Sequence, residues 1–93
     1  MAQAPLTGGS SSYYSVNITN PCTPDREPYV AECQDIIEAL GMTFGLGNVF
    51  KAVWRICATK QGRGKPGTSL LYDAEKIEFF GAREVAIHST TKA

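Results

Sequence analysis

Apolar residues recur at helical spacing in three segments of the chain, and glycine ends or separates those segments. In the first segment, residues 28–40, apolar and acidic side chains fall on different arcs of a helical wheel, and Gly41 follows as a stop signal. The apolar arc holds Tyr29, Val30, Cys33, Ile36, Ile37 and Leu40, and the acidic arc holds Glu32, Asp35 and Glu38. The pattern predicts an amphipathic helix over residues 28–40.

A second helix is predicted over residues 46–59. Four apolar residues at i, i+3, i+4 and i+7 predict its core face: Phe50, Val53, Trp54 and Cys57. Asn48, Lys51 and Arg55 are three and four residues apart, so they form one stripe. We expect that stripe on the side opposite the core, in solvent.

The third predicted helix, residues 69–86, carries two apolar faces. One is a stripe of Leu70, Ala74, Ile77, Gly81 and Val85. The other holds Tyr72 and Phe79 beside Lys76 and Arg83. A chain of 93 residues has little internal surface to cover both faces, so we expect Tyr72, Phe79 and Arg83 to form an interface with another subunit or a partner.

The N-terminal part differs from the helical part. Residues 1–12 are small and polar and predict a flexible tail, which leaves residues 13–93 as a single small helical domain. Residues 13–19 are rich in aromatic and β-branched side chains and predict a short strand that Asn20 and Pro21 end. That strand needs a second copy, another extended segment, or helices to lie across as an arm. The predicted fold is mainly α, a three-helix small domain with a short N-terminal β-strand or arm. A homo-oligomer is expected, with a dimer favoured.

The amino-acid composition indicates which classes of partner and cofactor to expect. The formal net charge is zero, which argues against nucleic acid as a partner. No apolar run reaches the roughly 20 residues that span a bilayer, and no basic-apolar leader opens the chain, so we expect a cytoplasmic protein without a membrane partner. Three scattered cysteines and one histidine favour reduced thiols over disulfides or zinc, and we expect no metal or cofactor.

The distribution of charge is more informative than its total. No acidic residue lies between Glu38 and Asp73, whereas five cations do: Lys51, Arg55, Lys60, Arg63 and Lys65. Glycines in the loop over residues 60–68 would let backbone amides approach a phosphate. We predict an anion site formed by Asn48, Lys51, Arg55, Arg63, Lys65 and Lys76. The alternative is a solvated loop and a helix face that pairs with the acidic first helix.

Catalysis has a weaker basis in the sequence. Glu32, Asp35 and Glu38 could hold magnesium together with Asp73, although such a run is also typical of a solvated helix face. His88 has no evident nucleophile or carboxylate partner, and proline follows the Gly-Lys of QGRGKPGTS where a phosphate-binding loop needs serine or threonine. We therefore expect a binding protein rather than an enzyme, with a magnesium-dependent hydrolase as a third hypothesis.

Ten positions in residues 28–80 follow a recognisable order: Glu32, Asp35, Glu38, Phe44, Gly47, Asn48, Lys51, Arg55, Asp73 and Lys76. In this order the chain resembles a small tailed-phage domain of unknown function, which also occurs in phage proteins called nucleotide kinases. Ala52 stands where that family usually has tyrosine. The resemblance implies a phage origin and a helical accessory domain that acts in the infected host cell.

Two functions follow as expectations. The first is non-catalytic binding of a phosphorylated ligand, a nucleotide or nucleotide signal, which would sequester that ligand in counter-defence. The alternative is an inhibitor that binds a host defence protein or host enzyme through the aromatic face of the third helix.

Overall fold

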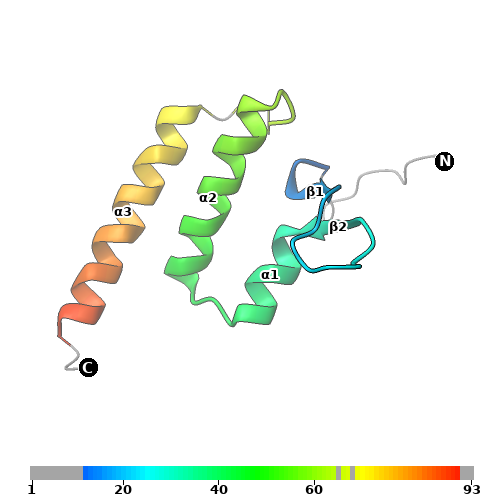
Figure 1. Ribbon diagram of the computed structural model, residues 1–93. Helices are drawn as coiled ribbons and strands as arrows, with labels where there is room; N and C mark the ends of the chain where they lie inside the picture. The colour runs from blue at the N-terminus through cyan, green and yellow to red at the C-terminus, as the bar shows by residue number, and fades with distance from the viewer. Residues whose placement is uncertain (1–11, 65, 68, 91–93) are drawn as a thin grey trace.

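The computed structural model describes residues 12–64, 66–67 and 69–90, which form three helices and a two-stranded antiparallel sheet (Figure 1). The elements in chain order are η1 (Ser12–Tyr14), β1 (Ser15–Ile18), β2 (Tyr29–Glu32), α1 (Cys33–Leu40), α2 (Phe44–Lys60) and α3 (Leu70–Ser89). The predicted mainly α fold with a short N-terminal β element is confirmed. The predicted tail lies outside the described residues, except for residue 12 in η1.

The sheet corrects the start of the first predicted helix. Residues 29–32 form β2, an edge strand paired with β1 in the register Val16 with Ala31 and Ile18 with Tyr29. Tyr29 and Val30 favour extended backbone, and their pairing supplies the backbone partners that β1 lacks alone. Another extended segment of the same chain, one of the three alternatives, is therefore the partner of the predicted strand.

The helix α1 is short, and its C-terminal end agrees with the sequence. Gly41 adopts a left-handed conformation with φ of 62°, and its N–H donates to the carbonyl of Glu38. The N–H of Met42 donates to the carbonyl of Ile37, which completes a glycine cap. The chain can then reverse into α2 within three residues.

The helices α2 and α3 form an antiparallel hairpin, with α1 beside α2 on the side away from α3 (Figure 1). Thr43 and Ser69 cap the two helices, because their hydroxyls accept hydrogen bonds from the N–H groups of Leu46 and Tyr72. Ala52 is fully buried on α2. None of the described helices is both long enough and apolar enough to cross a membrane.

The orientation of α2 differs from the prediction. Its buried residues are Gly47, Ala52, Arg55 and Ala58. Of the predicted core face, Phe50 and Trp54 are half-buried, whereas Val53 is 45% exposed and Cys57 is exposed. Small side chains let the neighbouring helices approach α2 closely, so the face that carries them turns inward although it also carries Arg55. The prediction that Arg55 lies in solvent was wrong.

Candidate functional site

A buried ion pair joins the two long helices. Arg55 on α2 places Nη2 2.8 Å and Nε 2.9 Å from Oδ1 of Asp73 on α3. Its Nη1 donates to the hydroxyl of Tyr14 at 2.9 Å, so the guanidinium also holds the N-terminal segment. Arg55 is 6% exposed and Asp73 is 1% exposed. Arg55 therefore stabilises the arrangement of three segments and is not free to bind a ligand.

The surroundings of Arg55 keep it charged. Burial alone would lower the pKa of the guanidinium, but the hydrogen bonds with Asp73 and Tyr14 outweigh burial and raise that pKa above its usual value. The Cys33 thiol is also buried nearby, and burial raises its pKa more strongly than the positive charges of Lys51 and Arg55 lower it. The ion pair thus lies in a dry region where losing one partner would leave the other uncompensated.

Two lysines each lie one helical turn from a member of the ion pair. Lys51 lies one turn before Arg55 on α2, and Lys76 lies one turn after Asp73 on α3. Because the helices are antiparallel, both positions lie on the same side of the ion pair along the hairpin. Each lysine is half-buried, with Nζ 5.9 Å from the ring centre of Tyr14 for Lys51 and 5.3 Å from that of Tyr72 for Lys76. Rings beside the two lysines restrict where their ammonium groups lie.

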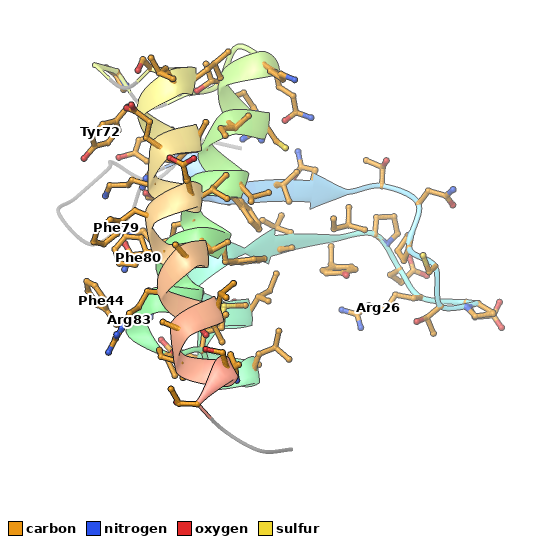
Figure 2. All side chains as sticks on the ribbon, turned by 90° about the vertical axis from the view of Figure 1, so that its left-hand side faces the viewer. Arg26, Phe44, Tyr72, Phe79, Phe80 and Arg83 are labelled. Carbon is orange, nitrogen blue, oxygen red and sulfur yellow. The ribbon has the colours of Figure 1, made fainter. Side chains whose placement is uncertain are left out.

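Exposed aromatic rings continue this surface toward the end of α3. The rings of Phe44 and Phe80 meet edge to face at 5.7 Å, and those of Phe79 and Phe80 at 5.1 Å. Phe44 is 80% exposed, Phe79 69% and Tyr72 49%. Figure 2 shows these four side chains and Arg83 on one side of the hairpin, opposite the side from which the β-strands project. Large aromatic groups left this open are typical of a surface that contacts something else.

We call this surface the front face. It consists of the Arg55–Asp73 ion pair, the side chains labelled on this side of the hairpin in Figure 2, and three residues that helical spacing places on the same sides of α2 and α3. The labelled side chains are Phe44, Tyr72, Phe79, Phe80 and Arg83, and the three further residues are Asn48, Lys51 and Lys76. The side-chain amide of Asn48 donates to the carbonyl of Phe44 at 2.7 Å, one turn earlier on α2. Asp73 is neutralised by Arg55, so Lys51, Lys76 and Arg83 give the front face an excess of positive charge. The predicted interface and the core of the predicted anion site are therefore one surface.

Two residues of the predicted anion site do not belong to the front face. Arg63 donates from Nη1 to the carbonyl of Ser15 at 3.0 Å and from Nε and Nη2 to Gln61. It lines a groove with Val16 and Trp54, on another side of α2 from Lys51. Lys65 lies outside the described residues. Arg63 therefore does not join the glycine-rich loop to the stripe of Asn48, Lys51 and Arg55 in a single anion site.

The acidic residues do not form a metal site among the residues that the structure describes. Asp73 is paired with Arg55, away from the exposed Glu32, Asp35 and Glu38 of the α1 region. Glu38 accepts a hydrogen bond from Gln34. His88 has a carboxylate neighbour that the sequence did not reveal, since its Nε2 lies 3.3 Å from Oε1 of Glu84 one turn earlier.

Tyr14 and Asp73 are the residues whose roles sequence reasoning missed. Tyr14 was assigned to a strand, and Asp73 was considered only as a metal ligand or part of a family pattern. One signal in the sequence could have indicated these roles: Arg55 shares a helix face with small residues. If that face is buried, the guanidinium needs an acidic or hydroxyl partner elsewhere in the chain.

Comparison of the chain with protein-family models, curated proteins and solved structures finds no match. Arg55 and Asp73, two of the positions that carry the resemblance described above, have a structural role in this chain.

Proposed function

We propose that this protein is a non-catalytic phage accessory protein that acts in the host cytoplasm and binds a phosphorylated ligand, a nucleotide or nucleotide signal, at the front face. The observation that carries the proposal is the meeting of cations and open aromatic rings on one rigid surface. Lys51, Lys76 and Arg83 can contact phosphate oxygens, and Tyr72 and Phe79 can stack on a base. Sequestration of the ligand in counter-defence follows, because binding alone removes a signal.

The ion pair explains why such a face would be preorganised. Asn48, Lys51 and Lys76 extend from helices that Arg55 and Asp73 lock together. A ligand that bridges α2 and α3 therefore meets groups whose spacing is already set, which reduces the ordering cost of binding. No nucleophile or metal is required for this chemistry.

Lys51→Ala is expected to weaken nucleotide binding by about 10- to 100-fold, because a charge-assisted hydrogen bond contributes roughly 1.5–3 kcal/mol. Isothermal titration calorimetry with ATP, GTP and a cyclic dinucleotide checks this, with Lys76→Ala as a second variant. Lys60→Ala is the matched control, since Lys60 is an exposed lysine at the end of the same helix, away from the front face. Absence of binding to all three nucleotides, or equal affinities in wild type and both front-face variants, would refute the proposal.

A second candidate is an inhibitor that binds a host protein through the same face. The 80% and 69% exposure of Phe44 and Phe79 favours it, because open aromatic residues beside arginine are common interface anchors. Phe79→Asp is then expected to abolish capture of a host polypeptide from lysate while leaving helicity unchanged. Affinity capture with mass spectrometry makes the comparison, and a folded variant that retains the captured polypeptide would exclude this candidate.

A further inference from the structure

The side of the hairpin opposite the front face is apolar. On α2, Leu46, Phe50, Val53 and Cys57 recur at i, i+4, i+7 and i+11 and share one stripe. On α3, the corresponding stripe is Leu70, Ala74, Gly81 and Val85. It lies on one side of the residues that face α2, which are Asp73, Phe80 and Glu84. The exposed front-face residues Tyr72, Phe79 and Arg83 lie on the other side. We call these two stripes the back face.

The back face is open to solvent in the monomer. Leu46 is 43% exposed, Val53 45%, Leu70 43% and Val85 69%. Charged residues border both stripes, since Lys60 follows Cys57 by three residues on α2 and Glu78 follows Ala74 by four on α3. Lys51 and Arg55 point elsewhere. A surface with several large apolar side chains exposed together is typical of an interface.

The β-strands form a wall beside this face. They project from the side of the hairpin opposite the front-face side chains (Figure 2). Because opposite residues of an antiparallel pair share a face, Val16, Ile18, Tyr29 and Ala31 lie together on one side of the sheet. Val16, Phe50, Val53 and Cys57 line a groove of about 230 Å³ that Gln61 and Arg63 border, so this side of the sheet and the back face form one concave, mainly apolar corner.

The monomer lacks a core large enough to compensate for this exposure. Its buried apolar side chains, among the described residues, are Cys33, Ala52 and Ala58. A domain of this length is marginal even when its large apolar side chains are buried. Covering the back face would therefore add the apolar burial that the monomer lacks, and a second copy of the same chain carries an identical apolar face.

The size of the face suits that occupant. A helix of 17 residues is about 26 Å long and one of 20 residues about 30 Å, and two packed helices are roughly 20 Å wide. The projected area is on the order of 500 Å², and side-chain relief together with the β wall brings it toward the ~800 Å² per partner of a stable interface. A predominantly apolar face can pack against an identical copy of itself, as a two-fold interface requires.

We propose that the back faces of two chains pack together in a two-fold dimer, forming a four-helix bundle flanked by the two β-sheets. The front faces then lie on the outside of the bundle, where each stays accessible. Dimerisation and ligand binding thus use opposite sides of the hairpin. Substitutions can therefore distinguish dimerisation from ligand binding. A substitution on the back face is expected to change the oligomeric state, and one on the front face is expected to change ligand affinity.

The test is the molar mass of the full chain by light scattering during size exclusion. Wild type is expected at twice the chain mass of 10.0 kDa and to remain so at high salt, because the contact is apolar. Val85→Glu is expected to weaken dimerisation at least about 100-fold, since each dimer would bury two unpaired charges. Phe79→Asp, an exposed charge substitution on the front face of the same helix, is the matched control and is expected to stay dimeric.

Alkylation of Cys57 gives an independent readout. Cys22 and Cys57 are both exposed in the monomer, but Cys57 lies on the back face. In the dimer, Cys22 is expected to react with iodoacetamide much faster than Cys57, and Val53→Glu is expected to abolish that difference. A wild-type monomer with native helicity, a folded Val85→Glu variant that remains dimeric, or equal reactivity of the two cysteines in wild type would overturn the proposal. The cysteine comparison decides the outcome even if a glutamate variant fails to fold.

Discussion

Arg55→Ala is expected to remove a large part of the protein's free energy of unfolding. The substitution leaves the carboxylate of Asp73, which is 1% exposed, without its ion-pair partner. Removing one member of a buried ion pair costs about 3–5 kcal/mol. That loss is comparable with the whole stability of many small domains, which is roughly 5–15 kcal/mol. The variant also frees Tyr14 and with it one attachment of the N-terminal segment.

Urea denaturation followed by circular dichroism at a fixed chain concentration measures this effect. Lys51→Ala is the control, because Lys51 lies one turn away, forms no buried ion pair and is expected to change stability by less than about 0.5 kcal/mol. Arg55→Met combined with Asp73→Leu is expected to recover much of the loss, since it removes both charges from the dry region. An unchanged denaturation midpoint for Arg55→Ala would show that the ion pair does not hold the helices together.

Ala52→Leu is expected to destabilise the protein by about 1–3 kcal/mol, because the added carbon atoms at a fully buried position force neighbouring groups apart. Ala52 is 0% exposed, on the helix that packs against both α1 and α3. Thermal unfolding compares it with Ala82→Leu, the same substitution at an exposed position of α3, which is expected to leave stability within about 0.5 kcal/mol of wild type. Equal unfolding temperatures for the two variants would contradict the close packing of α2.

The helices were predictable because their signals are local. Periodicity located all three, and Gly41 correctly marked the end of α1. The error at residues 29–32 has a simple cause: Tyr29 and Val30 fit an apolar helix arc and also favour a strand, and only the pairing with β1 decides between the two. A wheel cannot represent a partner strand that lies elsewhere in the chain.

The orientation of α2 was not predictable by the same means. A wheel separates Phe50 and Trp54 from Lys51 and Arg55, but it does not say which face meets another element. Arg55 is buried because Asp73, 18 residues later, and Tyr14, 41 residues earlier, satisfy its donors. Whether a charged group is buried depends on such distant partners, which a helical wheel does not show. The exposed aromatic residues of α3 were predictable because their exposure requires no partner elsewhere in the chain.

The attachment of η1 to α2 has a consequence for biogenesis. Trp54 donates from Nε1 to the carbonyl of Tyr13, and Arg55 donates to Tyr14, each across 41 residues of chain. During translation the N-terminal segment therefore emerges long before its partners, and Arg55 itself must wait for Asp73. Contacts between residues so distant in sequence form late in folding. The nascent chain carries Tyr13 and Tyr14 without these partners until α2 leaves the ribosome, so closure of the N-terminal segment reports that α2 has been made.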